Sequence, residues 1–259
     1  MLTTEHRVLP GPTRASLPQL TLAGILGIWA AAALPMAALA WLVAPRLADA
    51  LDGPSAWPRA LIGVLTVGLV WQFVLVLGLV LREQGTLRWS VVKEALWVRS
   101  PVDPTTGRRG GRTWWILLPL VLAIALREEL PKLSPVADRD MGLLLASDAG
   151  ETFLSGNWVW FAVIVAMAIF NTVLGEELLF RGFLLPRMQG LFGRGDWAAN
   201  GVLFAAYHLH VPWAIPMVLL DALILAFPSR RYRSALVGIA VHSAQSLVVI
   251  GLVLALVLQ

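Results

Sequence analysis

Polar groups that can do acid–base chemistry stand inside the apolar carboxyl-terminal half of this 259-residue chain. The first is Glu176-Glu177-Leu-Leu-Phe-Arg181. On a helix, Glu177 and Arg181 are four residues apart and can pair on one face, whereas Glu176 points about 100° away. One glutamate would then be ion-paired and structural, and the other would serve as a general base. The alternative is a charged helix end at the membrane surface.

The other two groups contain histidine. Phe204 precedes His208 by about one helical turn, which favours packing of the two rings, and His210 follows as an interfacial or supporting residue. His242 and Ser246 are four residues apart and share a helix face. Taken alone, His208 fits a core histidine bonded to a backbone carbonyl. Small polar residues such as Ser246 also fit a helix-packing seam.

Three separate apolar segments each contribute an ionisable side chain, which favours a shared site. One glutamate and two histidines can hold a metal ion or can activate a water directly. The chain has no cysteine, which excludes disulfides, thiolate metal sites and a cysteine nucleophile. It also lacks a Gly-x-Ser-x-Gly elbow, a Gly-x-Gly-x-x-Gly loop and a His-Glu-x-x-His helix. A water nucleophile fits the absence of cysteine, although a membrane serine hydrolase needs no cysteine either.

The composition indicates that membrane helices position these groups. Hydrophobic residues make up 58% of the chain and charged residues 14%, whereas a soluble domain carries about 25% charged residues. The apolar residues occur in runs close to the roughly 20 residues that cross a bilayer. Basic residues lie between these runs, so we expect the lipid bilayer as a partner and no nucleic acid.

We predict an all-α, polytopic transmembrane helix bundle of about seven spans. They are residues 20–44, 60–81, 114–126, 154–174 with a continuation to 188, 197–211, 213–227 and 235–258. We also expect an interfacial helix within 86–98, a bend at Pro35, a loop at 190–195 and a helix N-cap at Asp196. An eighth span would have to be re-entrant or interfacial. Residues 1–150 carry N-terminal spans without a motif, and residues 151–259 form the catalytic bundle.

Charge predicts the orientation of these spans. The loops after the second, fourth and sixth spans are basic, and the loop after the third is acidic. Under the positive-inside rule the amino terminus and the basic loops are cytoplasmic, and the carboxyl terminus is extracytoplasmic. Glu176 then lies toward the cytoplasmic side of its span, where we expect substrate to enter.

The three groups resemble the CAAX protease and bacteriocin-processing (CPBP) family, which includes the type II CAAX prenyl endopeptidases and the bacterial abortive-infection (Abi) proteins. The resemblance covers about residues 170–246. Gly175-Glu-Glu-Leu-Leu-Phe-Arg-Gly-Phe183 and Tyr207-His-Leu-His210 look like its bacterial branch. The resemblance implies an intramembrane endopeptidase in a bacterial plasma membrane.

The resemblance also implies roles for the catalytic residues. Glu176 would activate the attacking water, with His208 helping to hold it, while Glu177, Arg181 and Phe204 would support them. His242 and the residue at position 246 would stabilise the oxyanion. Position 246 is serine here, where the prenyl endopeptidases carry asparagine, so its donor is shorter. We favour direct glutamate catalysis without a cofactor. Zinc held by Glu176, His208 and His242 is the alternative.

Three functions are consistent with these sequence features. The leading one is hydrolysis of a peptide bond in a lipidated peptide, a bacteriocin-like peptide or a membrane protein. The second is a non-catalytic immunity or regulatory protein that binds a peptide in the same pocket. The third is a transporter that uses its intramembrane acids, Asp221 among them, for proton coupling. The chain lacks the repeated broken-helix pattern of many transporter folds.

Overall fold

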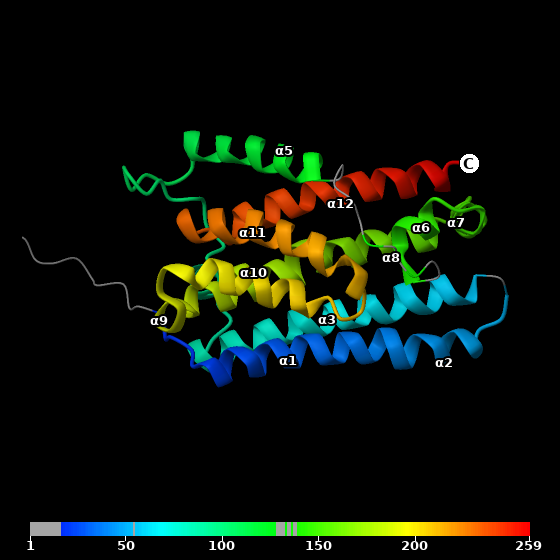
Figure 1. The fold of residues 1–259 in the computed structure, drawn as a ribbon, viewed down its shortest axis with the longest axis horizontal. Coiled ribbons are helices and arrows are strands. Elements are labelled where there is room, and N and C mark those ends of the chain that lie inside the picture. Colours follow the sequence, from blue (N-terminus) through cyan, green and yellow to red (C-terminus); the bar gives the residue numbers. More distant parts are fainter. Residues whose placement is uncertain (1–16, 54, 128–132, 134–135, 137–138) are drawn as a thin grey trace, which may run out of the picture.

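A computed structural model describes residues 17–53, 55–127, 133, 136 and 139–259. Over these residues the protein is a bundle of helices, and its only β-type pairing is one isolated bridge between Val102 and Arg109. The first 16 residues and most of the acidic loop at 128–138 lie outside the described residues. The long helices run roughly side by side along the molecule, with α1 at one side and α5 at the other (Figure 1).

The longer elements before the Glu-Glu motif are α1 (Leu22–Ala38), η1 (Leu39–Val43), α2 (Ala44–Asp49), α3 (Ala56–Gln84), α4 (Trp89–Ala95), η2 (Gly111–Ile116), α5 (Leu117–Arg127), α6 (Met141–Leu145), α7 (Asp148–Leu154) and α8 (Trp158–Ile169). Those around and after it are η4 (Phe170–Gly175), η5 (Leu178–Leu184), η6 (Leu185–Arg187), α9 (Gln189–Phe192), η7 (Gly193–Gly195), α10 (Asp196–Tyr207), η8 (Pro212–Ala214), α11 (Ile215–Arg231) and α12 (Ala235–Val257).

The protein is an all-α membrane helix bundle, as the sequence predicts. Five helical stretches in the described part are long and apolar enough to cross a bilayer: Leu22–Asp49, Ala56–Gln84, Trp158–Arg187, Pro212–Arg231 and Ala235–Val257. Gly111–Leu126 is a shorter apolar helix, and α10 has 12 residues. Each of the seven predicted spans contains a helix, but only the five described stretches above are long and apolar enough to cross a bilayer, and predicted span 197–211 is helical only as far as Tyr207. Large apolar side chains on the outside, such as Val67 and Leu247, suit contact with lipid tails.

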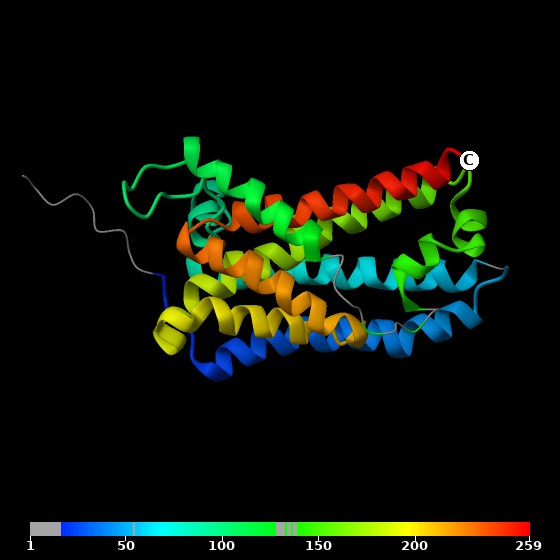
Figure 2. The same cartoon turned by 45° about the horizontal axis from the view of Figure 1, so that its top comes forward.

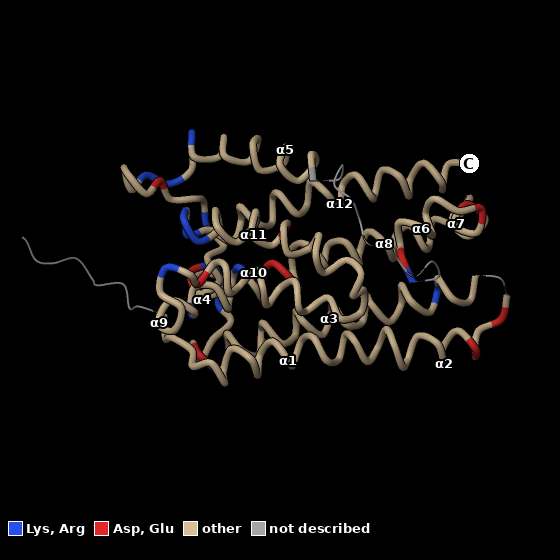
Figure 3. The backbone as a smooth tube through the Cα atoms, viewed as in Figure 1, with Lys and Arg blue, Asp and Glu red and all other residues tan. Residues whose placement is uncertain are grey.

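Charged residues separate along the bundle axis. Basic residues gather at the end that holds α4 and α9, and acidic residues of α2 and α7 lie at the opposite end (Figure 3). The chain begins its first helix at the basic end and finishes at the opposite end, as a second view also shows (Figure 2). This polarity is the pattern that the positive-inside rule describes.

Pro35 lies inside α1 and removes one helical hydrogen bond, because proline has no backbone N–H. The carbonyl oxygen of Ala31, which would have accepted that bond, instead accepts from the indole Nε1 of Trp71 at 2.8 Å. A π-helical turn, η1, follows and carries the chain into α2. The π-helical turn thus begins four residues after the proline at which the sequence predicts a bend.

Span four continues beyond its apolar part, as predicted, and a buried ion pair anchors its end. Arg187 is fully buried and its Nη2 lies 2.6 Å from the Oε1 of Glu83, at the end of α3. Its Nη1 also donates to the carbonyl oxygens of Ala95 and Phe183, at 3.1 and 2.8 Å. Buried charges need such partners. Arg187 therefore joins α3, α4 and the end of span four.

Two local predictions are wrong. Residues 190–195 are not an open loop, because α9 and η7 occupy them. Asp196 is the first residue of α10 and not its N-cap, a position held by Gly195. The Asp196 carboxylate is buried and forms an ion pair with Arg230 instead. The predicted helix within 86–98 is confirmed as α4, with Val92 buried and Trp89 exposed.

Candidate active site

The Glu-Glu motif lies inside the bundle, between two π-helical turns. Glu176, Glu177 and Arg181 are only 3%, 0% and 0% exposed, so the alternative of a charged helix end at the surface is wrong. The turns η4 and η5 flank the pair on either side. Gly175 has no room for a side chain, because a Cβ there would lie 2.5 Å from the carbonyl oxygen of Phe170. π-Helical turns often occur at functional sites.

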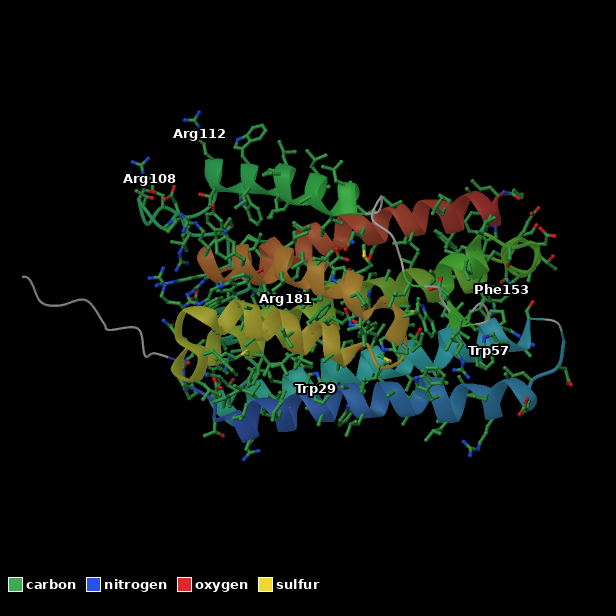
Figure 4. The ribbon with its side chains drawn as sticks, viewed as in Figure 1. Trp29, Trp57, Arg108, Arg112, Phe153 and Arg181 are labelled. Carbon is green, nitrogen blue, oxygen red and sulfur yellow. The ribbon has the colours of Figure 1, made fainter. Side chains whose placement is uncertain are left out.

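Glu177 is the ion-paired member, as its spacing from Arg181 predicts. Its Oε1 lies 3.3 Å from Nη1 of Arg181 and 3.2 Å from Nδ1 of His242 on α12. The Arg181 guanidinium also stacks 4.0 Å from the centre of the Phe204 ring, and its Nη2 donates to Ala222 O at 3.4 Å. Figure 4 shows Arg181 in the interior of the bundle. Glu177 therefore links span four to α12.

Glu176 has neutral partners. With its amide nitrogen toward the carboxylate, Asn171 donates to both oxygens of Glu176, at 2.9 and 3.2 Å. The hydroxyl of Tyr207 also hydrogen bonds with this carboxylate and accepts a bond from the Nε2 of Gln72 on α3. Neutral donors hold a carboxylate in one orientation without the direct ion pair that occupies Glu177. Among the described residues, Glu176 is therefore the member of the pair without a direct ion-pair partner.

Sequence reasoning missed Asn171, Tyr207 and Gln72. Asn171 lies five residues before Glu176. In an α-helix this spacing would point the two side chains in different directions, but the wider π-helical turn η4 places them on the same side. Tyr207 stands next to the histidine motif, and Gln72 is a polar residue in a strongly apolar span. That last feature was the signal available in the sequence, because polar groups inside membrane spans are costly and need a partner.

The α10 helix ends at Tyr207, so His208 lies at its C-cap and not within a span. Its Nδ1 lies 2.9 Å from Phe204 O, and its ring centre lies 5.0 Å from that of Phe204, which confirms the predicted packing. The backbone bond is the one expected of a core histidine. The ring of His210 stacks on His208 at 5.3 Å. The 12 residues of α10 make a helix only about 18 Å long, which is shorter than the roughly 30 Å hydrocarbon core of a bilayer. His208 and His210, which follow the end of this helix, therefore lie within the bundle.

A cavity of about 250 Å³ lies beside Glu176. Its walls are mostly apolar, and its polar lining residues are Arg139, Asn171, Glu176, Tyr207, His210 and Ser246. Glu176 and Ser246 therefore face one space. His208 and His242 do not line this cavity: His208 stacks against His210, and His242 binds Glu177. His210, predicted to be interfacial or supporting, lines the cavity.

The residues named for zinc do not form a ligand set. Within the part of the chain that the structure describes, no group of three His, Asp or Glu side chains is arranged to hold a metal ion. His242 binds Glu177 through its Nδ1, and the Nδ1 of His208 faces the Phe204 carbonyl oxygen. Within the described residues, Glu176, His208 and His242 are therefore not gathered into a zinc ligand set.

Fold and site together define a membrane-embedded α-helical protein with buried acidic and histidine side chains beside a cavity. Residues 157–248 match the family model described as type II CAAX prenyl endopeptidase Rce1-like. No curated protein and no solved structure matches the chain. The match includes all three polar groups. Over these residues the chain is similar to the CAAX protease family.

Proposed function

We propose that this protein is an intramembrane endopeptidase in which Glu176 activates the attacking water. The observation that carries this proposal is the contrast between the two acids. Glu177 is neutralised by Arg181 and His242, whereas Glu176 faces the cavity and is held by neutral donors. The substrate is a membrane-associated peptide, lipidated or bacteriocin-like, because the cavity walls are mostly apolar.

In the proposed reaction a peptide carbonyl lies in the cavity beside Glu176. The carboxylate takes a proton from a water as the water oxygen attacks the carbonyl carbon, and a tetrahedral intermediate forms. The Ser246 hydroxyl, which faces the same cavity as Glu176, donates to its oxyanion. His242 binds Glu177 outside the lining of this cavity and holds that carboxylate in place. His208 supports the water-binding side through its packing with Phe204 and His210. Glu176 then gives the proton to the departing amide nitrogen, which leaves a new carboxylate and a new amine.

We assign catalysis to residues 151–259 and a supporting role to residues 1–150. Residues 1–150 contact the site directly. Gln72 on α3 donates a hydrogen bond to Tyr207, and Leu61 and Leu65 form part of the cavity wall. We place the basic end of the bundle in the cytoplasm of a bacterium, with the amino terminus inside and the carboxyl terminus outside. The bundle spans the plasma membrane in this proposal.

Hydrolysis can be tested without knowing the natural substrate. Purified full-length protein in lipid nanodiscs, incubated with a library of apolar peptides in water enriched in ¹⁸O, is expected to yield shorter peptides. Each new carboxyl terminus should contain one ¹⁸O atom, because the water oxygen enters the carbonyl group of the cleaved bond. Mass spectrometry of the products checks this. Intact peptides that are nonetheless retained by the protein would support the alternative of a non-catalytic immunity or regulatory protein.

Metal removal should leave cleavage unchanged. We expect 1,10-phenanthroline or EDTA to change the rate less than about twofold, because direct glutamate catalysis needs no Lewis acid. Elemental analysis of the purified protein should give far less than one zinc per chain. A rate that falls on chelation and returns when zinc is added would overturn direct glutamate catalysis in favour of a metallopeptidase.

A further inference from the structure

We propose that Arg139 and His210 form an anion-binding subsite in the cavity, which takes a carboxylate group of the bound peptide. The inference rests on the proposed function, because Glu176 lines the same cavity. Arg139 lies just before α6, and His210 lies between α10 and η8. Arg139 is the cation among the described residues that line the cavity. Its charge is opposite to that of a peptide carboxylate.

The guanidinium of Arg139 is held by stacking, which leaves N–H groups for a ligand. Its central carbon lies 4.2 Å from the ring centre of Trp41 and 4.9 Å from that of Trp57. Nη1 donates to the carbonyl oxygen of Ala40 at 3.1 Å. An arginine has five N–H donors, and across the described ranges no other protein acceptor is seen for this one. A stacked guanidinium with donors to spare suits bidentate binding of a carboxylate.

A second, independent observation points to a ligand. The Nδ1 atom of His210 is buried and has no hydrogen-bond partner within the described part of the chain. A buried polar atom without a partner is unfavourable, and most such atoms in proteins are paired. Stacking on His208 fixes the ring in its place on the cavity wall. A ligand in the cavity would give this nitrogen the partner that it lacks.

Hydrogen bonds connect the surroundings of Arg139 to the loop that carries His210. The indole nitrogen of Trp41, which stacks on Arg139, donates to the carbonyl oxygen of Leu209 at 2.8 Å. Asp140, next to Arg139, accepts from the indole nitrogen of Trp213 at 3.0 Å. The His210 loop is thus bonded on one side to Trp41, which stacks on Arg139, and on the other side to Asp140 in the segment that carries Arg139. The subsite is therefore built on one connected framework.

Tyr207 separates this subsite from the proposed base. Its ring centre lies 5.7 Å from that of His210, and its hydroxyl bonds to Glu176. A bound peptide would thus place its carboxylate at Arg139 and its scissile bond beyond Tyr207. Trp57, whose ring stacks on Arg139, lies toward the end of the bundle away from the basic loops (Figure 4). The subsite therefore favours substrate entry from that end, and not from the cytoplasmic end predicted from the sequence.

Binding to the full-length, non-cleaving Glu176→Gln protein tests the subsite. The probes are an acetylated Leu/Val hexapeptide with a free carboxylate, the same peptide as its carboxamide, and a carboxamide with one internal glutamate. We expect at least one carboxylate form to bind about tenfold more tightly than the neutral carboxamide, as one charge-assisted pair would give. The two carboxylate probes tell whether the terminus or an acidic side chain is read. Adding Arg139→Gln should remove the difference, and Arg139→Lys should restore part of it.

The matched control is Arg46→Gln, because Arg46 is exposed on α2 and lies outside the cavity lining. It should keep the tenfold preference. Equal affinity for all three peptides, absence of binding, a preference that survives Arg139→Gln, or displacement by phosphatidylglycerol alone would overturn the subsite. Wild-type protein that hydrolyses charged and neutral peptides equally would overturn it too, while leaving Glu176 as the base. Loss of the proposed function would instead appear as the absence of any ¹⁸O-labelled product.

Discussion

Glu176→Gln is expected to lower the cleavage rate constant by about a thousandfold and to leave the protein folded. The amide has nearly the same shape as the carboxylate but cannot take a proton from water, and a general base contributes about 10²–10⁴-fold. Substrate affinity should change little, because Asn171 and Tyr207 can still bond to the glutamine side chain. Initial rates measured over a range of peptide concentrations separate these two effects.

Thermal unfolding in detergent, followed by the fluorescence of the 12 tryptophans, provides the folding control for this variant. Glu176→Gln should unfold at the wild-type temperature or above, because it removes a buried charge that has no direct ion-pair partner. The matched control is Glu151→Gln, since Glu151 is exposed on α7. That variant should keep full activity. Undiminished cleavage by Glu176→Gln would show that another group is the base.

Glu177→Gln should behave differently from Glu176→Gln, which separates the two adjacent acids. It leaves the fully buried Arg181 without its carboxylate, and breaking a buried ion pair from one side costs about 3–5 kcal/mol. We therefore expect a clear fall in unfolding temperature for Glu177→Gln. If both glutamine variants were equally stable and equally inactive, the division into base and ion-paired support would be wrong.

Gly238→Ala is expected to destabilise the protein by about 2 kcal/mol, a typical cost of overpacking. It should also slow cleavage at least tenfold. A Cβ at this position of α12 would lie 2.3 Å from Oε2 of Glu177 and 3.1 Å from Oγ of Ser229. Either α12 moves outward or Glu177 leaves Arg181 and His242. Both responses displace Glu177, which is the residue next to the proposed base and which binds His242. Thermal unfolding and initial-rate measurements on the same preparation report the two effects.

Gly251→Ala is the matched control for this prediction, because it lies on the same helix and a Cβ there would meet no atom within 4 Å. It makes the same chemical change and raises helix propensity by up to about 1 kcal/mol. We expect it to be fully active and at least as stable as wild type. If Gly238→Ala matched Gly251→Ala in stability and rate, the close packing of Glu177 against α12 would be contradicted.

The part of the site predictable from sequence is the part that lies along one helix. Glu177 and Arg181 pair as a four-residue spacing requires, and Phe204 packs on His208 as the same spacing indicates. The helical turn fixes these distances whatever surrounds the helix. Even here the prediction was incomplete, because α10 ends at Tyr207 and places His208 at the helix end.

The partners of each acid were not predictable in this way. His242 was expected beside Ser246 at the reacting carbonyl, and its Nδ1 binds Glu177 instead. Asn171 reaches Glu176 because η4 is π-helical, and one wider turn changes which side chains share a face. A sequence pattern cannot show such a turn when the surrounding residues are all apolar.

The sequence by itself determined the solvent of this protein, its helical class and the chemistry available, because apolar run length and residue type decide those directly. Only the tertiary structure decided which glutamate faces a cavity, that His210 and not His208 lines it, and that Arg139 joins them. Those facts depend on the rotation and depth of helices packed against one another. Many apolar side chains permit similar packing, so the apolar pattern does not specify the rotation and depth of each helix. Buried polar contacts such as Glu177–His242 and Gln72–Tyr207, in contrast, are made in only one arrangement of the helices.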